Sequence, residues 1–313
     1  MLEKLKQIAA SKMADQNFDC LAVSVLNFNT SRFECFELTN KSVITSGEPS
    51  LFFDLASLTK PLTLASTFLK EPKLFSSDLE LLLNHRGSLP EWGRLSKETW
   101  KEQISAYPIK KADVLYSDFS ALRLMLELEK KSGKELKDLC SFFWDKALVH
   151  WKELPKNANT ANSGSRKGQP IHGDVHDDNA FVLNQFCSHA GMFGTINGLS
   201  QSLLNLDSKS NLIDVMKKAM PKKGPDERYV NGWDTVSNPE DTLAGPGCGA
   251  LTFGHLGFTG TSVWIDPEKG IGSVILSNAT QKHWYSREQL KDLRQALGSA
   301  IWCQIPSAND ALD

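Results

Sequence analysis

The stretch Asp54-Leu55-Ala56-Ser57-Leu58-Thr59-Lys60-Pro61-Leu62-Thr63 decides how the rest of the sequence is interpreted. Apolar residues with helical spacing run through it and beyond it: Leu58, Leu62, Ala65 and Leu69. This spacing predicts a helix from Ser57 to about residue 70 with one buried face. Ser57 and Lys60 lie three residues apart, so their side chains share a face of that helix. Ser57 also lies near the helix start, where backbone N–H groups and the helix dipole favour developing negative charge.

A serine and a lysine at this spacing can form a nucleophile and its base. A serine hydroxyl is a weak nucleophile until a neighbouring base takes its proton. A buried lysine can be that base, because burial lowers its pKa. S-x-x-K, here Ser57 to Lys60, is the nucleophile motif of penicillin-recognising serine hydrolases. The four-residue pattern alone fits equally a capped amphipathic helix with a surface lysine, so its interpretation depends on the rest of the chain.

Three further motifs follow in the chain: His85-Arg86-Gly87-Ser88-Leu89-Pro90, Tyr116-Ser117-Asp118 and His255-Leu256-Gly257. With residues 54–63 they cover about residues 50–280 and resemble, in order, the beta-lactamase-related serine hydrolase family. That family groups class C beta-lactamases, low-molecular-weight penicillin-binding proteins (DD-peptidases) and related esterases. The resemblance implies a serine hydrolase that forms an acyl-enzyme with an amide or ester, without a cofactor. A D-amino-acid peptide, a beta-lactam and a small ester all remain open as substrates.

The second motif of the family is Tyr-x-Asn, whose tyrosine helps to take and return the proton of the serine. Tyr116 takes that position, so the resemblance implies a catalytic role for it beside Ser57 and Lys60. Asp118 replaces the asparagine of the motif. A carboxylate near Lys60 would favour its ammonium form and raise its pKa, which leaves the base open between Lys60 and Tyr116. Alternatively, Asp118 could be the N-cap of a helix starting at Phe119.

The third motif of the family is Lys-Thr-Gly on the strand that lines the cleft, and His255-Leu256-Gly257 takes its place. The resemblance implies that His255 contacts substrate and that Gly257 leaves room for it along the strand. By the same analogy, the backbone N–H groups of Phe258 and Ser57 would form the oxyanion hole. Histidine is only partly charged near neutrality, so we expect weaker binding of a substrate carboxylate than with lysine.

A segment near the middle of the chain is dense in metal-ligand residue types: His172, Asp174, His176, Asp177, Asp178 and His189. This density suggests a metallohydrolase that uses the region from His172 to His189 as an alternative. No H-E-x-x-H or other zinc spacing is present. Relatives in the resembled family carry a similar stretch at the cleft rim, which places His189 near substrate and predicts no metal. A second alternative is a non-catalytic protein of the penicillin-binding fold, its chemistry weakened by Asp118 and His255.

The hydrophobic patterns predict strands at both ends of the chain and helices in the middle. Strands are expected over residues 19–28, 32–38, 261–266 and 271–277, in two hairpins. Helices are expected over residues 1–8, 119–131, 135–149 and 287–303, with a long surface loop over residues 152–170. The predicted fold class is therefore α/β (α+β), with an antiparallel sheet flanked by helices, the frame of the resembled family. Residues 1–56 and 225–313 would form the sheet domain, and residues 57–224 a mainly helical insert.

Composition narrows the class of protein and its partners. Of the 313 residues, 41% are hydrophobic and 23% are charged, and the formal net charge is −2. These values are typical of globular proteins, and the absence of a basic block argues against a nucleic-acid partner. No apolar run reaches the roughly 18 residues that a membrane span needs. We expect a small-molecule or peptide substrate and no obligatory protein partner.

The six cysteines are scattered without a C-x-x-C pair, which predicts free thiols. Residues 1–8 lack the apolar core of a signal peptide. Both observations favour a cytoplasmic protein, with a periplasmic location as the alternative if a leader has been removed.

Overall fold

The fold is described by a computed structural model that covers residues 1–39, 42–43, 51–282 and 287–303. The strands of its main sheet are β1 (Cys20–Asn27), β2 (Arg32–Thr39), β3 (Ser42–Val43), β9 (Tyr229–Val230), β10 (Trp233–Thr235), β11 (Phe253–Leu256), β12 (Ser262–Asp266) and β13 (Ile271–Ser277). Their order is β3-β2-β1-β13-β12-β11-β10-β9, and every neighbouring pair is antiparallel. The N-terminal hairpin therefore pairs with the C-terminal strands through β1 and β13. This arrangement confirms the predicted α/β fold class.

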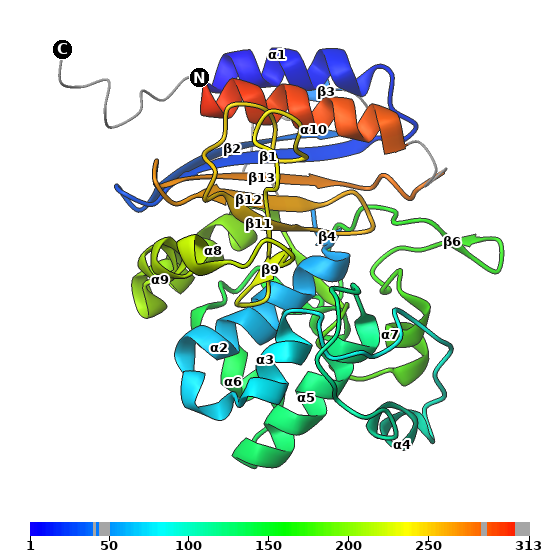
Figure 1. Cartoon of the computed structure of the whole chain (residues 1–313). Helices are drawn as coiled ribbons and strands as arrows, with labels where there is room; N and C mark the ends of the chain where they lie inside the picture. Colours follow the sequence, from blue (N-terminus) through cyan, green and yellow to red (C-terminus); the bar gives the residue numbers. More distant parts are fainter. Residues whose placement is uncertain (40–41, 44–50, 283–286, 304–313) are drawn as a thin grey trace.

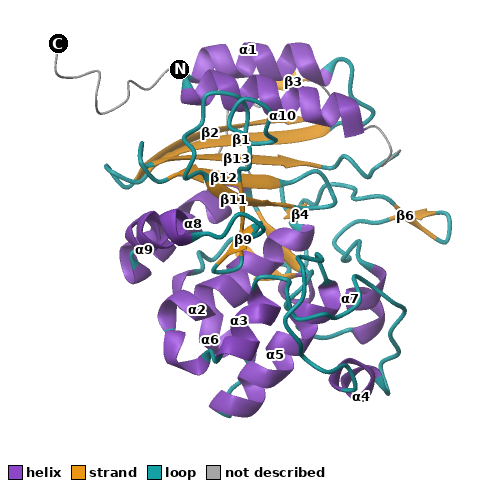
Figure 2. Ribbon diagram, viewed as in Figure 1, coloured by secondary structure: helices purple, strands orange, loops and turns teal. Residues whose placement is uncertain are grey.

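Helices cover both faces of this sheet (Figures 1 and 2). α1 (Leu2–Met13) and α10 (Arg287–Trp302) lie together on one face. α1 does so because Leu5, Ala9 and Met13, spaced four residues apart, are all fully buried. α8 (Ile196–Ser210) packs on the opposite face, where the sheet meets the rest of the helical region.

The remaining elements lie below the sheet in Figure 1. The helices are α2 (Ser66–Lys70), α3 (Ser77–Leu83), α4 (Trp100–Ser105), α5 (Asp118–Ser132), α6 (Leu136–Cys140), α7 (Asp178–Leu183) and α9 (Leu212–Ala219). A small sheet has the order β4 (Phe53–Asp54), β8 (Met192–Gly194), β5 (Leu148–His150), and β6 (Ser165–Arg166) pairs with β7 (Gln169–Pro170). α5 has a buried apolar stripe and ends at Ser132, followed by the C-cap Gly133, whose φ of 69° suits a glycine.

One secondary-structure prediction is wrong and a second is incomplete. The helix expected over residues 135–149 ends at Cys140, and its last part is strand β5. β5 pairs with β8 and buries Leu148, so sheet hydrogen bonds replace the helix there. The surface loop expected over residues 152–170 contains the β6–β7 hairpin and buries Ala161. Its backbone is also held at Phe52, whose N–H donates to the Asn159 carbonyl and whose carbonyl accepts from the Ala161 N–H.

The helical segment after β4 is irregular at the point where the motif lies. It starts with a 3-10 turn, Ala56–Leu58, continues through a π-helical turn, Pro61–Ala65, and becomes α2. Pro61 has no N–H to give to a regular α-helical ladder. Every residue of Pro61–Ala65 is buried, so this segment runs through the interior.

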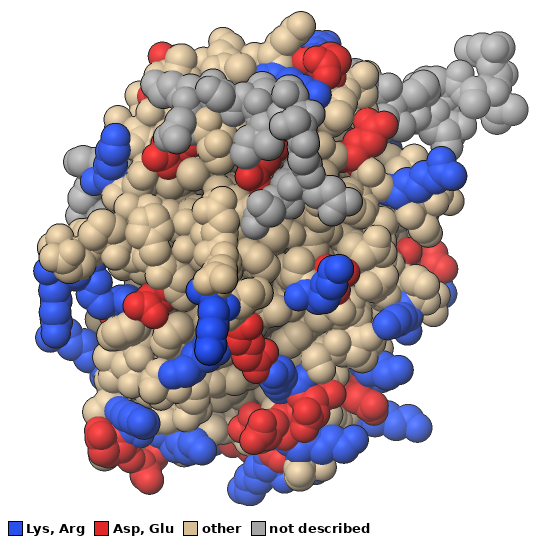
Figure 3. Space-filling model, turned by 180° about the vertical axis from the view of Figure 1, so that it is seen from behind, with Lys and Arg blue, Asp and Glu red and all other residues tan. Residues whose placement is uncertain are grey.

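No helix in the described part of the chain combines the length and apolarity needed to span a membrane. None of the six cysteines, all of which lie in the described residues, forms a disulfide. On the face drawn in Figure 3, acidic and basic side chains are interspersed rather than gathered by sign.

Candidate active site

Ser57 lies in a tight turn directly after β4, and the backbone there is strained. Ala56, the residue before it, has a φ of +46°, which a residue with a side chain rarely adopts. The turn is held from outside. The Leu55 N–H donates to the Met192 carbonyl at 2.9 Å, and the Thr261 hydroxyl donates to the Leu55 carbonyl at 3.1 Å. These bonds fix the backbone that carries the serine.

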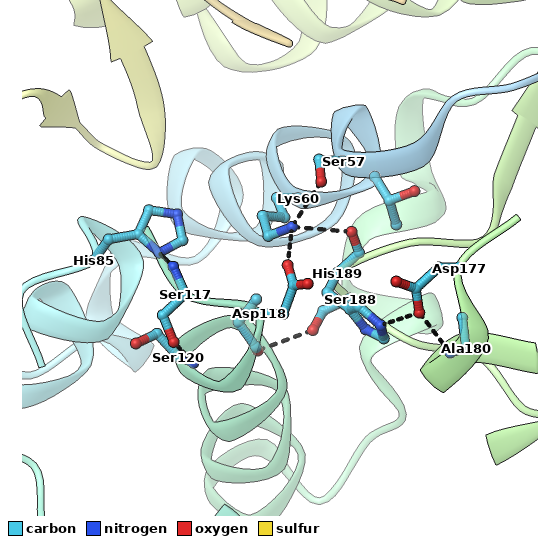
Figure 4. Close-up of polar contacts among 12 residues, drawn as sticks. Ser57, Lys60, His85, Ser117, Asp118, Ser120, Asp177, Ala180, Ser188 and His189 are labelled. Atoms are coloured by element: carbon cyan, nitrogen blue, oxygen red, sulfur yellow. Dashed lines mark hydrogen bonds and ion pairs between the residues drawn. The ribbon is translucent and has the colours of Figure 1, made fainter. Parts of the chain in front are cut away.

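Lys60 is surrounded by acceptors (Figure 4). Its Nζ lies 3.0 Å from Ser57 Oγ, 3.1 Å from the His189 carbonyl oxygen and 2.6 Å from Asp118 Oδ1. Lys60 Nζ donates hydrogen bonds to Ser57 Oγ and to the His189 carbonyl, and its contact with Asp118 is an ion pair. Burial lowers the pKa of Lys60, but the charge of Asp118 and the contact with Tyr116 outweigh it and raise the pKa above its ordinary value. Lys60, with 3% of its side chain exposed, is therefore an ammonium at neutral pH.

Tyr116 stands over this ammonium, with its ring centroid 4.8 Å from Lys60 Nζ. Burial raises the pKa of Tyr116, and the opposing effect of Lys60 and of hydrogen bonds to Lys60 and Ser57 does not cancel that rise. The ring packs against His85, at 4.7 Å between centroids. Tyr116 therefore carries its phenolic proton at neutral pH and can donate it.

Asp118 does not cap its helix. The cap of α5 is Ser117, whose Oγ accepts the Ser120 N–H at 2.8 Å. The Ser117 N–H in turn donates to Nδ1 of the buried His85 at 3.1 Å. Asp118 lies in the first turn of α5 with its carboxylate directed at Lys60, so the capping interpretation is wrong.

His189 contributes to the site through its backbone. Its carbonyl accepts from Lys60, while its ring Nε2 lies 3.0 Å from Asp177 Oδ1. The same Asp177 oxygen accepts the Ala180 N–H at 2.7 Å and caps α7. Burial raises the pKa of Asp177, but the interaction with His189 outweighs it and lowers the pKa well below its usual range. The His189 ring is turned toward Asp177 and is not among the residues that line the cavity beside Ser57.

The metal-ligand residue types between His172 and His189 do not converge. Within residues 1–39, 42–43, 51–282 and 287–303, no three or more His, Cys, Asp or Glu side chains are arranged to hold a metal ion. His172 is exposed and contacts the Thr160 carbonyl.

A cavity of about 500 Å³ opens beside Ser57. Of the predicted site residues, Ser57, Tyr116, His255, Gly257 and Phe258 line it. Lys60 and Asp118 are not among its lining residues. Further lining residues are apolar (Phe18, Leu243, Leu256, Leu290) or charged (Arg228, Asp234, Glu288, Lys291, Arg294). The cavity therefore places the Ser57 hydroxyl beside an apolar wall that also carries charged side chains of both signs.

His255 is neutral rather than partly charged, which corrects the sequence-based expectation. It is 3% exposed, and burial together with the charge of Lys60 lowers its pKa to about 3. Its Nδ1 lies 2.8 Å from the Leu256 carbonyl oxygen. Because a carbonyl oxygen only accepts hydrogen bonds, Nδ1 must carry a proton and act as the donor. His255 therefore supplies no cation for a substrate carboxylate.

Gly257 is required by packing. A Cβ at this position would lie 1.9 Å from Thr261 Oγ1 and 2.6 Å from the Leu55 carbonyl oxygen. The end of β11 is thus pressed against the turn that carries Ser57. Because glycine has no side chain, the two segments can touch. The sequence pattern alone did not indicate this packing role for Gly257.

Two arginines of the cavity were missed in the sequence. Arg228 makes a bidentate pair with Asp234, at 2.8 and 2.6 Å. Arg294 is only 6% exposed, and its Nη2 donates to the Thr261 carbonyl at 2.9 Å. Among the described residues, no carboxylate pairs with Arg294 and its Nε has no hydrogen-bond partner. The available signal was an arginine in the apolar stripe of α10, between Leu293 and Leu297.

Comparison with known proteins identifies relatives of this chain. The family model described as Beta-lactamase matches residues 80–297. An Escherichia coli (strain K12) protein named for a proposed D-alanyl-D-alanine carboxypeptidase activity is 34% identical over 197 residues, 52% of this chain and 44% of that protein. A Bacillus subtilis (strain 168) N-acetylmuramyl-L-alanine amidase is 30% identical over 122 residues, 36% of this chain and 27% of the amidase. The chain thus spans less than half the length of these relatives.

Solved structures show the same fold. A beta-lactamase from Mycobacterium bovis superposes with a TM-score of 0.61 at 16% identity, covering 95% of this chain and 99% of the other. SurE crystallised with D-Leu gives a TM-score of 0.66 at 14% identity, covering 95% of this chain and 75% of the other. The family model covers well over half of the sequence, and the chain belongs to the beta-lactamase family of serine hydrolases.

Proposed function

We propose that the protein hydrolyses an amide or ester through an acyl-enzyme on Ser57. The observation that carries the proposal is the 3.0 Å contact between Lys60 Nζ and Ser57 Oγ, beside a cavity that receives Ser57 and Tyr116. A nucleophile within hydrogen-bond reach of a base that is itself oriented by a third group is the arrangement that activates a serine.

In the proposed reaction, Lys60 acts as the base in the minor form that has lost a proton. Ser57 Oγ bonds to the carbonyl carbon while its proton passes to Lys60 Nζ. Tyr116 gives its phenolic proton to the leaving nitrogen or oxygen, and Lys60 then returns a proton to Tyr116. Water attacks the resulting ester, and the acyl group leaves as a carboxylic acid. The backbone N–H groups of Ser57 and Phe258 are the proposed donors to the oxyanion.

Asp118 sets the pH range of this reaction. It holds Lys60 as an ammonium, so the reactive neutral lysine is a small fraction near pH 7. The rate should therefore rise with pH through the neutral and alkaline range.

We further propose that the substrate carries a carboxylate that binds Arg294, as a peptide ending in a D-amino acid does. Burial lowers the pKa of Arg294 to about 10, which still leaves it charged at neutral pH. Burying a guanidinium without an anionic partner costs free energy, and a substrate carboxylate in the cavity would supply that partner. The D-alanyl-D-alanine carboxypeptidase name of a relative agrees with this choice.

The substrate proposal is tested with a matched pair of esters, one carrying a free carboxylate and one neutral. Arg294→Gln should lower kcat/KM for the carboxylate ester by about 10- to 100-fold, because a hydrogen bond to a charged group contributes about 1.5–3 kcal/mol. The neutral ester should be hydrolysed at the original rate. Arg123→Gln, which replaces a largely buried arginine of α5 that does not line the cavity, is the control. Equal losses for both esters in Arg294→Gln would refute the substrate class and leave the serine mechanism standing.

Covalent labelling of Ser57 distinguishes the proposed hydrolase from the alternative, a non-catalytic protein. A fluorophosphonate should add one adduct to Ser57, and Ser57→Ala should remove both the adduct and ester turnover. Ser77→Ala, at an exposed position of α3, is the matched control.

A further inference from the structure

The strained turn before Ser57 is held by a carboxylate that sequence motifs do not mark. Asp54, the last residue of β4, is 2% exposed. Its Oδ1 accepts the Ala56 N–H at 2.8 Å, and its Oδ2 accepts the His176 N–H at 2.6 Å. One oxygen therefore holds the left-handed residue next to the nucleophile, and the other holds a segment 122 residues away in the chain.

The segment bound by the second oxygen leads to Lys60. His176 is followed by Asp177, which fixes the ring of His189, and the His189 carbonyl accepts from Lys60. The His176 ring also packs against Phe258, at 5.5 Å between centroids, on the wall of the cavity. Asp54 thus joins the backbone of the nucleophile to the residues that place its base.

We propose that Asp54 is a positioning residue for Ser57 and Lys60. In its ionised form each carboxylate oxygen accepts a backbone N–H, and these two hydrogen bonds hold Ser57 and Lys60 in their relative positions. A protonated carboxyl keeps one good acceptor, because its hydroxyl oxygen becomes a donor. One of the two N–H groups then loses its partner, and the strained turn is free to relax. The proposal rests on the proposed function, since it concerns the reactivity of Ser57.

This arrangement has a predictable dependence on pH. Burial raises the pKa of Asp54 to about 6, although the N–H groups of His176 and Ala56 oppose the rise. The charged groups that face Asp54 are Asp177, which raises its pKa, and Arg166, which lowers it. The Thr259 hydroxyl, which comes from beyond β11, donates to the Asp54 carbonyl at 2.6 Å and brings no charge.

The experiment measures the rate of Ser57 labelling by a fluorophosphonate between pH 4.5 and 8. Above pH 6, loss of one proton from Lys60 gives a logarithmic rate with a slope of about 1 against pH. Below pH 6, Asp54 must also be ionised, so the slope should approach 2. In Asp54→Asn the slope should stay near 1 throughout, with a rate about 10- to 100-fold below wild type at pH 7.

Asp266→Asn is the matched control, because the buried Asp266 also ends a strand, β12, and its Oδ1 also accepts an N–H two residues ahead, from Glu268 at 3.0 Å, while its Oδ2 accepts the Gly249 N–H at 2.8 Å. It should keep the wild-type rate and slope. A wild-type slope of 1 down to pH 4.5 overturns the proposal, even if Asp54→Asn fails to fold. A folded Asp54→Asn that is labelled like wild type also overturns it. If Ser57→Ala is labelled as fast as wild type, the proposed function itself fails instead.

Discussion

Replacing Asp118 by Asn tests the electrostatics of the site most sharply. The substitution keeps the shape of the side chain and an oxygen acceptor but removes the negative charge next to Lys60. Lys60 Nζ retains Ser57 Oγ and the His189 carbonyl as further partners. Because burial then dominates, we expect the pKa of Lys60 to fall and the neutral base to become more abundant near pH 7.

The size of this effect follows from the distance. Two unit charges 2.6 Å apart interact by about 6 kcal/mol at an effective dielectric constant near 20, which is equivalent to roughly 4 to 5 pKa units. This is an upper bound, since the asparagine oxygen still accepts a hydrogen bond. Neighbouring opposite charges in proteins usually shift a pKa by about 1–3 units. The rate near pH 7 should therefore rise by about 10- to 1,000-fold if Lys60 alone limits it.

The assay is kcat/KM for p-nitrophenyl acetate and the labelling rate of Ser57, each between pH 5 and 10. In wild type both rates should climb with unit slope from pH 6 to 10, and Asp118→Asn should reach any given rate at a pH 1–3 units lower. Asp78→Asn is the control, because Asp78 is an exposed carboxylate in the first turn of α3, as Asp118 lies in the first turn of α5. An unchanged profile in a folded Asp118→Asn would refute the reasoning that the ion pair controls the base.

Three further predictions concern the cavity and its support. His255→Lys should raise kcat/KM for a carboxylate ester relative to a neutral ester, because it replaces a neutral imidazole by a cation at the cavity wall. An unchanged ratio of the two kcat/KM values would show that this position does not contact the substrate carboxylate. Gly257→Ala should cost about 1–3 kcal/mol in the free energy of unfolding measured with urea, because its Cβ would overlap Thr261 and Leu55, whereas Gly224→Ala, whose nearest contact is 3.4 Å, should be near neutral. Folding raises the pKa of Asp54, so the stability that this group contributes is present below about pH 4 and lost as pH rises through about 6. The melting temperature of wild type should therefore fall over this pH range more than that of Asp54→Asn.

Local patterns were sufficient to predict four strands of the main sheet and the helices α1, α5 and α10. Alternating residues around turn formers identified β1, β2, β12 and β13, and the apolar stripe of α5 marked it as a helix. The wrong assignment at residues 141–149 has a physical cause. β5 exists because β8, more than 40 residues later, supplies its hydrogen bonds, and no local pattern carries that information.

The residues of the site were predictable as types, but their protonation states were not. The S-x-x-K spacing and the Tyr116 motif identified groups that do lie together around Ser57. The neutral state of His255 depends on complete burial beside Lys60, and the clamp at Asp54 depends on a contact with His176 across the fold. The place of Arg294 in the cavity depends on the path of α10 across the fold, which no local sequence pattern specifies.

The most direct test of the central claim is the intact mass of the protein after reaction with a fluorophosphonate. One adduct located by peptide mapping on Ser57 is predicted in wild type and in Ser77→Ala, with none in Ser57→Ala. A protein that stays unmodified at pH 9, where the neutral form of Lys60 is more populated than at pH 7, would contradict the acyl-enzyme account. So would an adduct that persists in Ser57→Ala.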